Sequence, residues 1–264
     1  MSAYDHLYGS TQNLSQSLSA FVYHYGIAEA IARNTDSPGV ALNDFFHYCV
    51  AKGSKHIRAA LVLVENEFPE DAIVLSRAAY ECYVSAAYAK AQGLNAIDDL
   101  VYNPVGLSAG TVHYAQTKTG GLDYRRLVDR RTEECYRSPP SIEKMVLSTG
   151  YEADAVVHRY YYGFSSQHAH VHMAGSGNYR DGTSYTDEGN EQRPNAVFLT
   201  AYATIVLMGL ARAVTQMDED EKSRIERELR AAVIHFNDVL DQHIKNLSDE
   251  FVQGVRSRLA RFIE

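Results

Sequence analysis

The stretch "AIVLSRAAYECYVSAAYAKA", residues 72–91, decides the fold because it is apolar on nearly every side over a length that suits a helix and not a strand. A helix that is apolar all round belongs in a core. The preceding residues 43–67 include the similar run "RAALVLV", and "FPED" separates the two segments. We therefore expect an antiparallel helix pair at the centre of an all-α, multi-helix bundle.

Two charged residues interrupt this central helix. Arg77 and Glu81 are the only charged side chains between residues 72 and 89, and a spacing of four places them on one helix face, which Ser85 and Tyr88 continue. Burying an arginine and a glutamate is costly unless they are paired and hydrogen-bonded. They form either a structural ion pair or part of a site, in which Arg77 holds an anion or a transition state. Glu81 would then act as a base, a metal ligand or the group that orients a histidine.

Helical periodicity extends outward along most of the chain. It predicts helices over residues 10–33, 122–136, 142–147, 151–164, 196–211, 218–247 and 248–264. Two long polar loops, 93–121 and 175–195, interrupt the pattern. We expect one α-helical domain over 1–264, with a motif core at about 40–215 and a C-terminal helical hairpin at 218–264. The apolar run 196–211 is shorter than the roughly 20 residues of a bilayer crossing, so we expect a buried helix and no membrane association.

Composition narrows the class of protein. Lys plus Arg number 25 against 33 for Asp plus Glu, a formal charge of −8, which argues against a broad DNA-binding surface and restricts any RNA contact to a local patch. In "YRRLVDRRTEE" acids interleave with the arginines, which favours a solvated helix face. Three cysteines without a C-x-x-C pair indicate neither a disulfide framework nor a thiolate zinc site. With no signal-like N-terminus, these features predict a cytoplasmic protein.

A histidine cluster stands in "SSQHAHVHMAGSG", residues 165–177. If the segment is helical, His168 and His172 share a face, and a metal site would need an outside ligand such as Glu81. If it is extended, His170 joins them, and the three nitrogens could form an open catalytic zinc site. A polar stripe on the preceding helix leads to this cluster and consists of Asp154, His158, Tyr161 or Tyr162, and Ser165. The candidate catalytic residues are Arg77, Glu81, Ser165, His168 and His172, and we expect Tyr88, His158 and Tyr162 in the same pocket.

The stretches "LSRAAYECYVSAAYAK" and "YYYGFSSQHAHVHMAG" together resemble the paired signature of a bacterial helical family of unknown function. That signature is similar to the HEPN superfamily (higher eukaryotes and prokaryotes nucleotide-binding domains). The resemblance covers about residues 55–175 and implies a helical, often dimeric bundle with metal-independent ribonuclease activity. The HEPN motif also has an arginine several residues before its histidine. Here Gln167 stands five residues before His172, and the nearest upstream arginine is Arg159.

Three functional hypotheses follow. The first is a HEPN-like RNA-processing or toxin-type ribonuclease that needs no cofactor, in which a histidine is the acid/base and Arg77 stabilises phosphate charge. The second is a hydrolase or oxygenase that uses a divalent metal on Glu81, His168, His170 and His172. The third is a non-catalytic interaction module with a structural Arg77–Glu81 pair. Expected partners are a second copy of the chain, bound through the C-terminal helices, and RNA or a small-molecule ligand.

Overall fold

The computed structural model describes residues 2–26, 37–169, 180–181, 184–185, 191–243 and 247–262. Most of these residues are helical. The main helices are α1 (Ala3–Tyr25), α3 (Pro38–Glu65), α4 (Pro69–Gln92), α7 (Glu152–Ala169), α8 (Arg193–Val214), α9 (Glu219–His243) and α10 (Asp249–Ala260). α1 begins seven residues earlier than its periodicity predicts. Ser2 caps it through a reciprocal capping box with Asp5.

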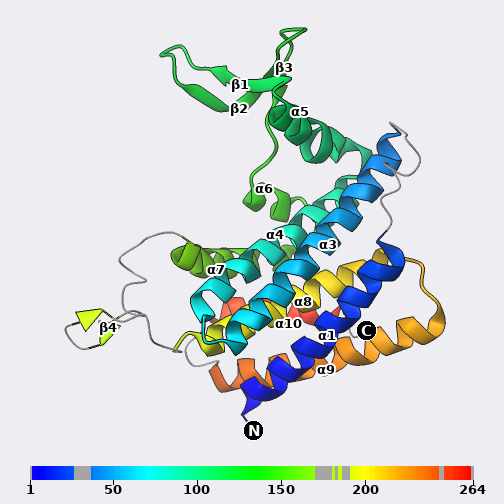
Figure 1. Ribbon diagram of the computed structural model, residues 1–264, viewed down its shortest axis with the longest axis vertical. Helices are drawn as coiled ribbons and strands as arrows, with labels where there is room; N and C mark the ends of the chain where they lie inside the picture. The colour runs from blue at the N-terminus through cyan, green and yellow to red at the C-terminus, as the bar shows by residue number, and fades with distance from the viewer. Residues whose placement is uncertain are drawn as a thin grey trace.

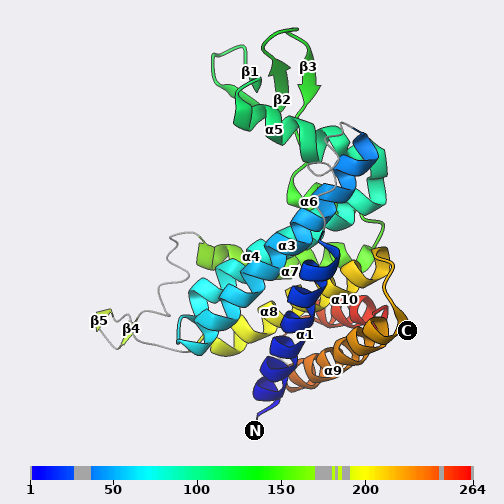
Figure 2. The same cartoon turned by 45° about the vertical axis from the view of Figure 1, so that its right-hand side comes forward.

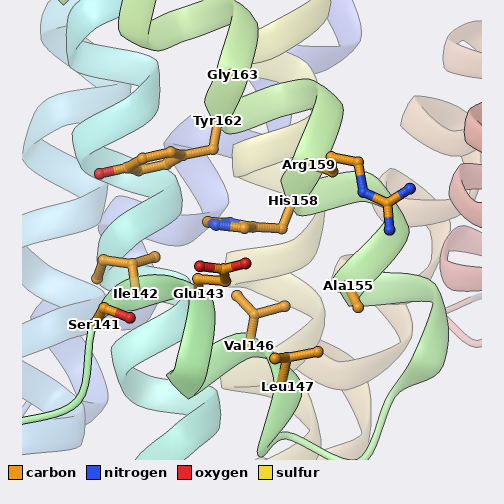
Figure 3. A pocket seen from close by; sticks show the side chains of 10 residues that line it. All are labelled: Ser141, Ile142, Glu143, Val146, Leu147, Ala155, His158, Arg159, Tyr162 and Gly163. Atoms are coloured by element: carbon orange, nitrogen blue, oxygen red, sulfur yellow. The ribbon is translucent and has the colours of Figure 1, made fainter.

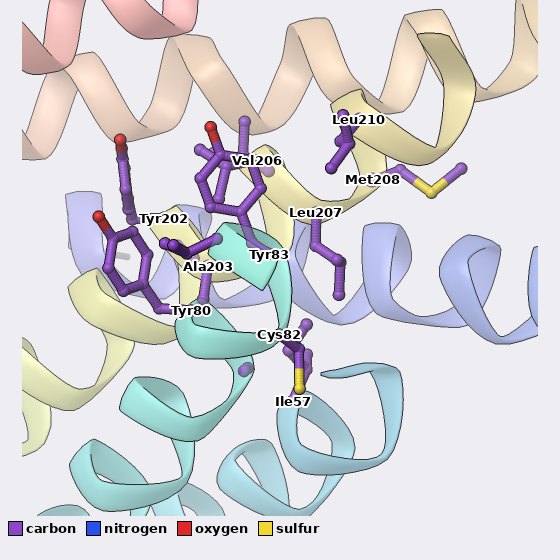
Figure 4. Packing of buried hydrophobic residues seen from close by; sticks show 14 of the residues in the cluster. Ile57, Tyr80, Cys82, Tyr83, Tyr202, Ala203, Val206, Leu207, Met208 and Leu210 are labelled. Atoms are coloured by element: carbon purple, nitrogen blue, oxygen red, sulfur yellow. The ribbon is translucent and has the colours of Figure 1, made fainter. Parts of the chain in front are cut away.

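Helices α3, α4 and α8 lie together at the centre of the bundle (Figure 1). They approach closely at Gly53 of α3, where an added Cβ would lie 2.5 Å from a methyl carbon of Leu207 on α8. Figure 4 shows the side chains that meet there, including Ile57, Cys82 and Leu207. This confirms the predicted central helix pair and adds α8 as its third member.

Helix α8 carries the apolar run that we expected to be buried. It is long and apolar enough to cross a bilayer, but 78% of its most apolar window is buried inside the protein. Its residues from Ala196 to Ala211, Phe198 excepted, are buried. The side chains of α8 therefore fill the core, as the sequence predicted.

A small sheet corrects the all-α expectation. Residues 93–121, expected to be irregular, form short helical turns η1 (Gly93–Ala96), η2 (Asp98–Tyr102) and α5 (Asn103–Ala109), followed by strand β1 (Val112–Gln116). Residues 122–136, expected to be a helix, form β2 (Leu122–Asp129) and the start of β3 (Cys135–Arg137). The antiparallel sheet β1-β2-β3 stands at one end of the molecule, beyond α5 (Figure 2). Apolar and polar residues need not alternate along a strand that is mostly exposed. Without that alternation the segment 122–136 was wrongly predicted to be a helix.

The C-terminal helices pack on different partners. α9 packs mainly on α1, and α10 packs mainly on α7. A buried ion pair joins α10 to α7, with Arg258 Nε 2.8 Å from Asp154 Oδ1. Tyr83 of α4 donates a hydrogen bond to the other carboxylate oxygen of Asp154 at 2.7 Å, and Arg258 donates one to the Tyr83 hydroxyl at 2.6 Å. This network fixes α7 between α4 and α10.

The second polar loop falls largely outside the described residues. Within it, the short strands β4 (Arg180–Asp181) and β5 (Ser184–Tyr185) pair antiparallel. α6 (Ile142–Leu147), which precedes α7, lies where the sequence predicted a helix.

Candidate functional site

Helices α6 and α7 enclose a cavity of about 430 Å³. It mixes aliphatic with polar and charged side chains: Ser141, Ile142, Glu143, Val146, Leu147, Ala155, His158, Arg159, Tyr162 and Gly163. The hydroxyl of Ser141 caps the short helix α6 by accepting a hydrogen bond from the backbone of Lys144. Figure 3 shows the result: the Glu143 carboxylate lies beneath the His158 ring, and Tyr162 lies above it.

His158 is the buried histidine of this cavity, with 7% of its surface exposed. Its ring stacks on Tyr162 with centroids 4.8 Å apart, and on Tyr80 at 5.9 Å. The Nδ1 atom is buried without a hydrogen-bond partner among the described residues. Burial lowers the pKa of His158 below 6.5, while Glu143 and Glu81 oppose that shift. A neutral imidazole that can accept a proton at neutral pH therefore lies in the wall of the cavity.

Arg77 and Glu81 do form a pair, and they support the histidine. Arg77 Nε lies 3.1 Å from Glu81 Oε1. The same guanidinium donates a hydrogen bond of 2.5 Å to the Tyr162 hydroxyl and lies 4.2 Å from the centroid of its ring. Because Tyr162 in turn stacks on His158, the Arg77–Glu81 pair orients the ring that covers the imidazole.

Three other predicted site residues lie elsewhere. Ser165 is fully buried, and its hydroxyl donates to the carbonyl oxygen of Tyr162 at 3.3 Å, so it belongs to the core. Tyr88, which we expected in the pocket, instead donates a hydrogen bond to Asp99 of η2 at 3.2 Å. His168 packs on Phe164 at 5.0 Å and does not line the cavity, and burial lowers its pKa.

The predicted metal ligands are only partly described. His170 and His172 lie outside the described residues, so the ligand set of Glu81 with the three histidines stays a prediction. Among the residues that the structure does describe, no group of three or more His, Cys, Asp or Glu side chains is arranged to hold a metal ion.

The two charged residues of the cavity, Glu143 and Arg159, were not among the predicted site residues. Glu143 lies in the first turn of a six-residue helix that carries no recognisable motif. Arg159 follows His158 directly, and its exposed guanidinium lies 3.5 Å from Glu250 of α10. The sequence could have indicated Arg159, because it directly follows His158, a member of the polar stripe. No local signal pointed to Glu143, because its position depends on how α6 packs against α7.

The fold and the cavity define a mostly helical protein with a polar, histidine-containing site between two helices. Residues 43–189 match the family of unknown function DUF5677. Because this match spans more than half of the chain, the protein belongs to that family. No curated protein and no solved structure matches it. The matched range begins within α3 and extends beyond β5, so it contains every residue that lines the cavity.

Proposed function

We propose that this protein is a metal-independent, HEPN-like ribonuclease whose acid/base group is His158. The observation that carries the proposal is a buried imidazole of lowered pKa in a cavity that also presents the Glu143 carboxylate and the Arg159 guanidinium. The motif resemblance of residues 55–175 to HEPN proteins suggests RNA as the substrate. Dimerisation and a cytoplasmic location remain part of this proposal.

The chemistry needs one proton acceptor that later becomes a donor. His158 removes the proton of a ribose 2′-hydroxyl, and the 2′-oxygen attacks the adjacent phosphorus. The bond from phosphorus to the 5′-oxygen then breaks, and the imidazolium returns its proton to that leaving oxygen. The products are a 2′,3′-cyclic phosphate and a 5′-hydroxyl, with no net change in proton count. Glu143 stabilises the imidazolium between the two transfers.

The two arginines have different roles in this proposal. Arg159 lines the cavity, so its guanidinium can neutralise the charge that develops on the phosphate. Arg77 already contacts both Glu81 and Tyr162. It is therefore a positioning residue, in place of the phosphate-binding role that the sequence suggested.

An RNA cleavage assay in excess EDTA tests the proposal. The parent protein should cleave, and His158→Ala should lower the rate about 100-fold or more, the usual contribution of a general acid/base. His113→Ala is the matched control, because His113 is an exposed histidine on β1, far along the chain from the cavity. Equal rates for the parent and His158→Ala would refute the role of this histidine. Cleavage abolished by EDTA would instead favour the metal-dependent alternative.

One observation favours a non-catalytic interaction module as the second candidate. The Arg77 guanidinium is held by an ion pair, a hydrogen bond and a ring contact within the protein, as in a structural network. In that case Arg77→Ala should lower the free energy of unfolding. Neither the parent protein nor any variant should then cleave RNA.

A further inference from the structure

Helix α3 presents a basic stripe on its exposed side, defined here as Tyr48, Lys52 and Lys55. The surrounding stretch, residues 45–64, contains Lys52, Lys55 and Arg58 but no Asp or Glu, in a chain whose formal charge is −8. All of these basic side chains are exposed. Within the described part of the chain, neither Lys55 nor Arg58 has a carboxylate within ion-pair distance. Positive charge is thus concentrated locally on an acidic protein.

Helix α4 lies between the helix that carries the stripe and the helix that lines the candidate site. Lys52 and Lys55 lie near enough to His56 of α3 to reinforce the lowering of its pKa that burial causes, and Glu81 of α4 opposes that shift. Glu81 acts in the same way on His158. Helix α4 packs on both α3 and α7, and the guanidinium of its Arg77–Glu81 pair donates a hydrogen bond to Tyr162 in the cavity wall. The Nε2 atom of His56 is buried without a partner among the described residues.

Tyr48 adds a surface for stacking. It is 55% exposed, and the Lys52 ammonium lies 5.7 Å from the centroid of its ring. Aromatic rings beside cations are what proteins use to hold single-stranded nucleic acid, since bases stack on the rings and phosphates bind the cations. The β1-β2-β3 sheet also carries arginines, but there acids accompany them, as in the 2.9 Å pair of Arg126 with Asp123.

From this arrangement we infer that the basic stripe of α3 is the docking surface for single-stranded RNA. The bound strand then crosses α4 and enters the cavity at His158. The inference rests on the proposed ribonuclease function for the identity of the polyanion. The exposed Tyr48 ring beside the Lys52 ammonium favours RNA over a second copy of the acidic chain as the occupant, because RNA offers bases for stacking as well as phosphates for the cations.

The test is binding of a fluorescently labelled uridine oligonucleotide of about 20 nucleotides, long enough for a typical single-strand site. Anisotropy is measured in EDTA on full-length His158→Ala protein, so that cleavage does not interfere, across a range of salt concentrations. Lys52→Gln/Lys55→Gln is compared with the control Lys118→Gln/Arg131→Gln, which removes two exposed charges from the turns that connect the strands of the β1-β2-β3 sheet.

Loss of two phosphate contacts should make the plot of log K against log salt concentration shallower by about 1.4 for the stripe variant. The ratio of parent to variant affinity should therefore be about 25-fold larger at 0.1 M salt than at 1 M. The control should bind like the parent. The inference is overturned if the parent does not bind, if the stripe variant binds unchanged, or if the stripe variant only converts a dimer to a monomer. Lysine-dependent binding without any cleavage activity would support the docking surface and refute the ribonuclease proposal alone.

Discussion

Replacing Arg258 with methionine should destabilise the protein strongly. Arg258 is 3% exposed and its ion-pair partner Asp154 is 2% exposed. The substitution therefore leaves a carboxylate in the core without its ion-pair partner, although the Tyr83 and Thr149 hydroxyls still donate hydrogen bonds to it. Breaking one side of a buried pair costs about 3–5 kcal/mol. The guanidinium also lies 4.2 Å from the Tyr151 ring centroid and 4.7 Å from that of Phe262, contacts that methionine replaces only in part.

Urea unfolding followed by circular dichroism measures this loss. With a slope of about 2–3 kcal/mol per molar urea, the unfolding midpoint should fall by about 1–2 M. Arg256→Met is the matched control: Arg256 lies on the same helix but pairs with Asp241 at the surface. Its substitution should cost under about 1 kcal/mol. Asp154→Asn/Arg258→Met, which removes both charges, should recover much of the stability.

The reasoning would be refuted if Arg258→Met and Arg256→Met lost the same small amount of stability. That result would mean that the ion pair contributes little to holding α7 against α10. It would also weaken the account of the site, because Asp154 lies one helical turn before His158 on α7.

Three further predictions concern the site. Glu143→Gln removes a charge that raises the pKa of His158, so the acid limb of the pH–rate profile should move to lower pH. Arg77→Lys keeps the charge but loses the planar contact with Tyr162, so kcat should fall about tenfold with KM little changed, as measured by steady-state cleavage. Burial lowers the pKa values of His158, His168 and His56, so the unfolded chain binds more protons just below pH 6.5. The free energy of unfolding should therefore fall as pH drops from 6.5 through the folded pKa values, a trend that urea titrations at several pH values can check.

Much of the helical framework follows from sequence because its apolar pattern is strong. Residues 72–91 are apolar nearly all round, and residues 43–67 contain the apolar run 59–64. They become α4 and α3, with ends within about five residues of those expected. The sheet could not be recognised by the same criterion, because Leu127 is the one fully buried residue on β2. A better signal was the pair Gly120–Gly121 between two strand-like runs, which is typical of a hairpin turn.

The site was predictable only where helical spacing determines it. The Arg77–Glu81 pair follows from a separation of four residues, and His158 from its place in a polar stripe. Tyr88 lies on the same face as Arg77, but eleven residues at 1.5 Å each place it about 16 Å along the helix. It therefore reaches Asp99 and not Tyr162. Glu143 depends on a tertiary contact between α6 and α7, which no local pattern encodes.

The most direct test of the central claim, that His158 acts as acid/base in metal-independent RNA cleavage, is mass spectrometry of RNA fragments produced in EDTA. The account predicts fragments with 2′,3′-cyclic phosphate and 5′-hydroxyl ends from the parent protein and from His113→Ala, and almost none from His158→Ala. Fragments with 3′-hydroxyl and 5′-phosphate ends, or no fragments from the parent protein, would contradict it.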